Sequence, residues 1–154
     1  MSDPKDSQPS RPPCSDPEAR QFDFWIGEWD CTWEGGRATN RIEAIMGGCV
    51  ILERFDGRPG LELDGMSVSV WNPVLRRWQQ TWVDSWGSYF ALTGEFRDGR
   101  MGLSCADTRE AGTMLRMLFE NITADGLDWS WSRSGDAGAT WEPLWELRYS
   151  RRSP

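Results

Sequence analysis

Five side chains in the middle of the chain have the chemistry of a general acid–base site. Asp84, Glu95 and Glu120 carry carboxyl groups, and burial in an apolar cavity raises the pKa of a carboxyl group toward neutrality, where it can transfer protons. Tyr89 and Arg116 can polarise a substrate carbonyl. These five are the candidate catalytic residues. The alternative interpretation is that they are solvated or form cross-strand ion pairs.

Tryptophan is the one compositional outlier, with 11 in a chain of 154 residues. Each indole is a large, rigid π surface on which a planar ligand can stack. For any single tryptophan, ordinary core packing is the simpler interpretation, but a domain of this size cannot hide all of them from its own cavity. The expected ligand-binding residues are Trp33, Trp82, Tyr89, Arg116, Trp131 and Trp145.

Composition excludes several kinds of site. The chain contains no histidine, which excludes a histidine-ligated haem, a Cys/His zinc site and a nucleophile activated by histidine. Neither the spacing of an EF-hand nor a glycine-rich phosphate loop occurs. A net charge of -7 disfavours nucleic acid and anionic membranes as partners. We therefore expect no metal and no cofactor.

The cysteines and the apolar residues bear on location. Cys14, Cys31, Cys49 and Cys105 are widely spaced and include no Cys-x-x-Cys pair. No apolar segment approaches the roughly 20 residues of a membrane helix, and the N-terminus lacks the pattern of a signal peptide. These features predict a cytoplasmic protein with reduced cysteines, in which Cys14 is exposed and has no function.

The N-terminal region differs in composition from the rest. Residues 1–20 contain five prolines among Ser, Asp and Lys, which predicts a disordered leader followed by one domain over residues 21–152. Asp16-Pro17-Glu18 is typical of a helix start and predicts a short helix over residues 19–24. Phe22, Phe24 and Trp25 would then plug one end of the sheet.

Beyond Gly27 the chain consists of short β-rich segments separated by turn residues. From Trp29 to Glu34 apolar and polar residues alternate, as in a strand with one buried face. Asp98-Gly99 and Asp125-Gly126 predict tight hairpins. Closure of sequential strands removes exposed edges, so we expect an up-and-down antiparallel β-barrel, with a sandwich as the alternative. The expected strands are 28–34, 37–46, 49–56, 63–71, 77–84, 88–97, 100–105, 113–122, 127–134 and 141–150.

Both faces of several predicted strands carry bulky side chains. Residues 90, 92 and 96 form a uniformly apolar face, whereas the opposite face from Tyr89 to Glu95 mixes apolar and polar groups. The face from Trp78 to Asp84 is mixed as well. This pattern suits a barrel with a cavity on one side and a cover of helix or partner on part of the other. Alternation alone leaves open which face points inward.

A family resemblance adds to these observations. Gly27-Glu28-Trp29 resembles the Gly-x-Trp signature of the calycin barrels, the lipocalins and their relatives. The resemblance implies that Trp29 seals the closed end of the barrel and that Arg148 or Arg151 stacks across it. A wider set of motifs resembles the bacterial family called domain of unknown function 1579, over roughly residues 20–152, which implies a calycin-like fold without an established common activity. These motifs are Phe22-Asp23-Phe24, Trp71-Asn72-Pro73, Trp78, Trp82, Asp84-Ser85, Asn121-Ile122-Thr123, Trp129 and the segment from Ser134 to Trp141.

Together these features predict a barrel that binds a small hydrophobic or aromatic molecule in a tryptophan-lined cavity. The alternative is a cofactor-independent cyclase, isomerase or hydratase that uses a cavity carboxylate as acid or base. A third interpretation is that the surplus aromatic side chains form a homodimer interface.

Overall fold

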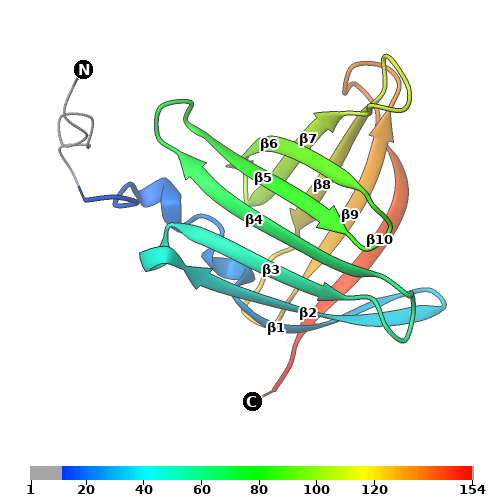
Figure 1. The fold of residues 1–154 in the computed structure, drawn as a ribbon, viewed down its shortest axis with the longest axis horizontal. Coiled ribbons are helices and arrows are strands. Elements are labelled where there is room, and N and C mark those ends of the chain that lie inside the picture. The colour runs from blue at the N-terminus through cyan, green and yellow to red at the C-terminus, as the bar shows by residue number, and fades with distance from the viewer. Residues whose placement is uncertain (1–11, 154) are drawn as a thin grey trace.

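The computed structural model describes residues 12–153, in which ten antiparallel strands close into a barrel (Figure 1). Each strand pairs with its neighbours in sequence, and β1 pairs with β10. This confirms the predicted up-and-down barrel and excludes the sandwich. The strands are β1 (Gly27–Trp33), β2 (Gly36–Ile45), β3 (Val50–Asp56), β4 (Asp64–Asn72), β5 (Arg77–Asp84), β6 (Tyr89–Arg97), β7 (Arg100–Ala106), β8 (Met114–Glu120), β9 (Gly126–Ser134) and β10 (Glu142–Arg151).

The predicted strands agree with these bounds to within two residues at every end. Turn chemistry explains the agreement. Asp98 and Gly99 join β6 to β7 with φ values of 54° and 75°, the left-handed conformation that a two-residue hairpin requires. Most of the expected leader, residues 1–11, lies outside the described residues. Within residues 12–153, no helix combines the length and apolar character needed to cross a lipid bilayer.

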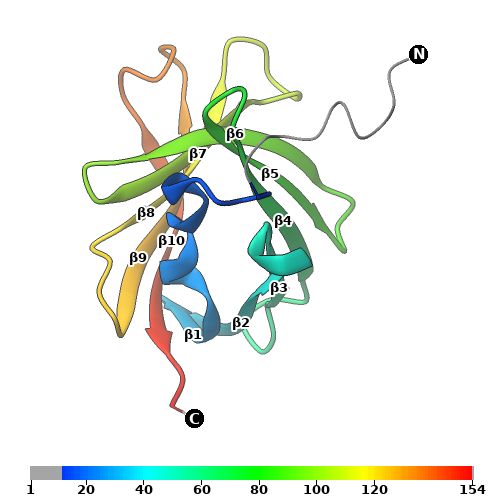
Figure 2. The ribbon, with the colours of Figure 1, turned by 90° about the vertical axis from the view of Figure 1, so that its left-hand side faces the viewer.

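Short helices cover one end of the barrel (Figure 2). They are η2 (Pro17–Arg20) and η3 (Asp23–Trp25), both 3-10 helices. The ring of Phe22 lies between them and packs on the rings of Trp25, Trp78 and Phe119, with centroid separations of 5.0, 5.2 and 5.2 Å. All four rings are buried. The predicted aromatic plug is therefore present, and this end of the barrel is closed.

Trp29 and Arg151 seal the barrel beside the plug. The guanidinium carbon of Arg151 lies 4.1 Å from the centroid of the Trp29 ring, and its nitrogens donate hydrogen bonds to three backbone carbonyl groups. Arg148 instead pairs with Asp128 at 3.1 Å. Gly27 suits this position because its φ of 135° is one that other residues rarely adopt, and because a Cβ atom would lie 2.3 Å from Nη1 of Arg151. Of the two expected arginines, Arg151 forms the seal.

A disulfide fastens the N-terminal segment to this closed end. Cys14 bonds to Cys49, which follows the short helix η4 (Met46–Gly48), and their Cα atoms are 5.3 Å apart. The prediction that all four cysteines are reduced is wrong for this pair. Cys14, which was expected to be exposed and without a function, is half-buried and forms a disulfide bond. The two residues are 35 positions apart, and the fold brings them together by placing the N-terminal segment near the β2–β3 connection. Cys31 and Cys105 are free thiols.

Candidate functional site

The barrel contains a cavity of about 280 Å³. Its deep end reaches Trp25 of the plug and Phe119 of β8, and its outer end reaches Trp86 and Ser88 in the β5–β6 loop and Arg109 in the β7–β8 loop. An apolar cavity of roughly 150 Å³ already holds benzene, so this space accommodates a small ring-containing molecule. The aromatic residues that line it are Trp25, Phe55, Trp82, Trp86, Phe90, Phe119, Trp129, Trp131, Trp145 and Tyr149.

Indole rings form much of the outer half of the cavity. Trp145 packs edge-on against Trp129 at 5.7 Å and against Trp33 at 5.2 Å, measured between ring centroids. Trp82 and Trp131 also line the cavity, so three of the four tryptophans predicted to bind ligand contribute directly to its surface. Trp33 lies behind Trp145 and supports it.

A buried carboxyl group that the sequence analysis did not single out lies deeper in the cavity. Glu53 on β3 is 5% exposed, accepts a hydrogen bond from Nδ2 of Asn40 at 2.7 Å, and accepts a second from Oγ of Ser67 at 2.7 Å. Burial raises the pKa of Glu53 from 4.5 to about 7, against the opposing effect of the two hydrogen bonds. Glu53 therefore titrates near neutral pH.

The hydrogen bonds continue from Asn40 toward β10 and β1. Nδ2 of Asn40 also donates to Oη of Tyr149 at 2.8 Å, and Tyr149 is hydrogen-bonded to Cys31. Burial raises the pKa of Tyr149 well above its ordinary value and raises that of Cys31 too, so both side chains stay protonated at neutral pH. Glu53 and Tyr149 face the cavity and present an acid and a phenol to any bound molecule.

The interior therefore has two different walls. We call Cys31, Asn40, Glu53, Ser67 and Tyr149 the polar wall; they come from β1, β2, β3, β4 and β10, which are consecutive around the barrel. We call the facing set from β6 to β9 the apolar wall. Its members are all buried: Leu92, Leu103, Met117, Phe119 and Leu127.

Asp84 lies at the outer end of the cavity and holds a loop. Its Oδ2 accepts from Nε1 of Trp82 at 2.8 Å, and its Oδ1 accepts from the backbone N–H groups of Trp86 and Ser88 at 3.0 and 3.1 Å. Partial burial raises its pKa, but the hydrogen bonds from Trp82, Ser88 and Trp86 outweigh burial, and the net pKa is lowered. The Asp84 carboxylate is therefore ionised, and both of its oxygens already accept hydrogen bonds from β5 and the β5–β6 loop.

The remaining predicted catalytic residues lie on the outside of the barrel. Tyr89 is 63% exposed, because it alternates with Phe90, which lines the cavity. The guanidinium of Arg116 stacks 4.2 Å from the centroid of the Trp141 ring. Two carboxylates pair with neighbouring arginines on this face: Glu95 with Arg97 at 3.5 Å and Glu120 with Arg100 at 3.7 Å. The structure thus does not bring Tyr89, Glu95, Arg116 or Glu120 to the cavity.

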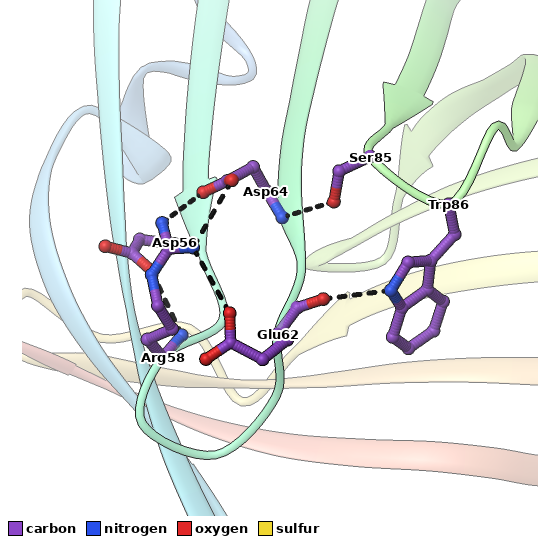
Figure 3. A network of polar contacts seen from close by, with 6 residues as sticks. All are labelled: Asp56, Arg58, Glu62, Asp64, Ser85 and Trp86. Carbon is purple, nitrogen blue, oxygen red and sulfur yellow. Dashed lines mark hydrogen bonds and ion pairs between the residues drawn. The ribbon is translucent and has the colours of Figure 1, made fainter.

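A polar network connects two loops at the outer rim (Figure 3). Arg58 pairs with Asp56 at 3.1 Å, with Glu62 at 3.7 Å and with Asp64 at 2.5 Å. Nε1 of Trp86 donates to the backbone carbonyl of Glu62 at 2.9 Å, which ties the β5–β6 loop to the β3–β4 loop. The network fixes Trp86 at the mouth of the cavity, where the residue is 63% exposed.

The sequence did contain a signal for Glu53. Ile51, Glu53 and Phe55 share one face of β3, and Glu53 is the one carboxylate on that face. Asn40 is placed in the same way between Ala38 and Ile42 on β2. A single polar residue on an otherwise apolar strand face marks a buried polar group that needs a partner.

The comparisons with known proteins give no assignment. No protein-family model matches the chain, and a search of the curated proteins finds no match. The resemblance to the calycin barrels and to domain of unknown function 1579 therefore stays a prediction.

Proposed function

We propose that the protein binds a small, mainly apolar or aromatic molecule in the barrel cavity. The observation that carries the proposal is a space of about 280 Å³, lined by indole rings and open to one buried carboxyl group and one phenol. Concave, mostly apolar sites with a few polar groups are typical of small-molecule binding. The resemblance of Gly27-Glu28-Trp29 to the calycin signature agrees with this proposal.

The two kinds of lining would share the recognition. Trp82, Trp131 and Trp145 offer faces and edges for stacking on a ring. Glu53 and Tyr149 would orient the polar end of the ligand. Each oxygen of Glu53 accepts one hydrogen bond from the protein, and a carboxylate oxygen has room for a second.

Titration with a panel of small aromatic compounds, followed by tryptophan fluorescence and calorimetry, tests the proposal. We expect saturable binding that Trp131→Phe weakens, because Trp131 lines the cavity. The matched control is Trp141→Phe, whose ring lies under Arg116 on the outer face and should leave affinity unchanged. A flat response across the panel, or equal effects of the two substitutions, would contradict the proposal.

One observation favours a second function, cofactor-independent acid–base catalysis. Glu53 has a pKa of about 7 and faces the cavity, so a bound substrate would meet a carboxyl group that can accept or donate a proton near neutral pH. A Glu53→Gln protein would then keep its affinity for substrate and lose turnover. Equal loss of binding and turnover would argue that Glu53 only binds.

A further inference from the structure

Building on the proposed function, we propose that the cavity prefers a small organic cation, an alkyl- or aryl-substituted ammonium, with the Glu53 carboxylate as its counter-ion. This assigns a charge class to the ligand, which size and aromatic lining alone do not. Three features of the interior support it: an unpaired buried acid, a set of ring faces, and the balance of charge along the cavity.

Glu53 has no cationic partner among the described residues. Its hydrogen-bond donors, Asn40 and Ser67, are both neutral, and no arginine or lysine contributes to its electrostatics. A buried carboxylate without a positive partner is costly, so such a group either pairs with a cation or takes up a proton, as Glu53 does below its raised pKa of about 7. A cationic ligand in the cavity would supply the positive charge that no side chain of the barrel provides to Glu53.

The aromatic rings that share the cavity with Glu53 suit the same ligand. The faces of indole and phenyl rings carry negative electrostatic potential and attract ammonium groups, most strongly where water is excluded. Trp82, Trp129, Trp131 and Trp145 line the cavity together with Glu53. A cavity that combines aromatic rings with a carboxylate attracts a cation more strongly than a neutral molecule of the same shape.

The charges along the cavity point the same way. Its charged lining residues are Glu53, Asp84 and Arg109. Arg109 belongs to the outer loop and is paired with Asp107 at 3.1 Å, so its charge is largely compensated. Of these three, Glu53 alone lies in the deep part of the cavity and Asp84 adds negative charge at its outer end, while the net charge of -7 further favours the approach of cations.

The preference should depend on pH through Glu53. The titratable groups that face it, Cys31 and Tyr149, stay neutral, and Asp84 is ionised throughout. A permanently charged ligand binds the carboxylate form of Glu53, so its affinity should rise as the pH passes upward through about 7. A neutral ligand of the same shape should show no such rise.

The test compares phenyltrimethylammonium with tert-butylbenzene, its neutral isostere, by calorimetry at pH 6 and pH 8. We expect the cation to bind about tenfold more tightly than the isostere at pH 8, and expect this ratio to fall at pH 6. Glu53→Gln should abolish the preference while retaining the isostere. Glu95→Gln, on the outer face, should retain both.

The outcomes separate this inference from the proposed function. If the isostere binds as tightly as the cation at both pH values, the cation preference is overturned and the binding function stands. If neither probe binds, both the cation preference and the proposed binding function fail. Should Glu53→Gln not fold, the pH dependence of the cation-to-isostere ratio in the unmodified protein decides the question, and a ratio that does not change overturns the inference.

Discussion

The polar wall and the apolar wall face each other across one cavity, yet they are stabilised in different ways. On the apolar wall every side chain belongs to the buried hydrophobic core, and Phe119 packs on the plug, so burial of apolar surface stabilises this wall. On the polar wall Glu53 depends on Asn40 and Ser67, and Asn40 also serves Tyr149. The comparison shows that apolar packing runs through the whole barrel, whereas the buried hydrogen-bonded groups that face the cavity are confined to the polar wall.

The largest effect should come from breaking the apolar wall. Phe119→Ala should lower the free energy of unfolding by about 3–5 kcal/mol, because the Phe119 ring is fully buried and packs on Phe22 and Trp25 at 5.2 and 5.0 Å. Denaturant unfolding measures the loss. Leu75→Ala is the control, since Leu75 is 56% exposed and should change stability little. A loss for Phe119→Ala no larger than the control would refute the stabilising role of this wall.

The next effect should appear on the polar wall as a pH dependence of stability. The pKa of Glu53 is raised from 4.5 in the unfolded chain to about 7 in the fold, so between these values the unfolded state binds fewer protons. The contribution of Glu53 to the free energy of unfolding should therefore be greatest below about pH 4.5. It should fall by about 3 kcal/mol as the pH rises from there through about 7, and stay constant at higher pH.

Unfolding by denaturant across this pH range checks the slope, and Glu53→Gln is the comparison protein. We expect the substitution to flatten the profile, whereas Phe119→Ala should shift the whole profile without changing its slope. An unchanged slope in Glu53→Gln would assign the pH dependence to other groups.

A smaller effect should follow from removing the central donor of the polar wall. Asn40→Ala deprives both Glu53 and Tyr149 of a hydrogen bond, and we expect a loss of about 2 kcal/mol in the free energy of unfolding. The loss should be larger at pH 8 than at pH 5, because the ionised carboxylate accepts the stronger bond. The control is Asn40→Ala in a Glu53→Leu background, where the cost should shrink and lose its pH dependence.

The smallest effect should come from the outer face. Glu120→Gln breaks an exposed ion pair with Arg100, and we expect a change in stability within about 0.5 kcal/mol and no change in ligand affinity. Calorimetric titration with the aromatic panel checks the second point. A marked loss of ligand binding in this variant would indicate that the outer-face residues form a binding site.

The fold was predictable because its signals are local. Asp98-Gly99 sets its hairpin through the φ preferences of two residues, and the alternation of β1 is visible within seven residues. Each of the ten strands could be located without knowing its partner. The pairing of β1 with β10 then followed from the need to remove exposed edges.

The site was less predictable because its signals are long-range. The faces around Tyr89 and Trp78 are both mixed in polarity, but the first points to solvent and the second to the interior. Local alternation is identical in the two cases. The hydrogen bond between Asn40 and Tyr149 joins residues 109 positions apart, and no local pattern in the sequence predicts it. The disulfide between Cys14 and Cys49 was missed for the same reason.

The seam between β1 and β10 has a consequence for how the protein is made. Trp29 lies opposite Arg151 across this seam. Of the ten strands, β1 is synthesised first, and it cannot complete its pairing until β10, the last of them, has been made. Until then the nascent chain presents an unpaired β edge, and Tyr149 is not yet available to Asn40. Ring closure is therefore the last pairing that the barrel can make, and until β10 docks, the open edges of β1 and β9 can pair with other chains.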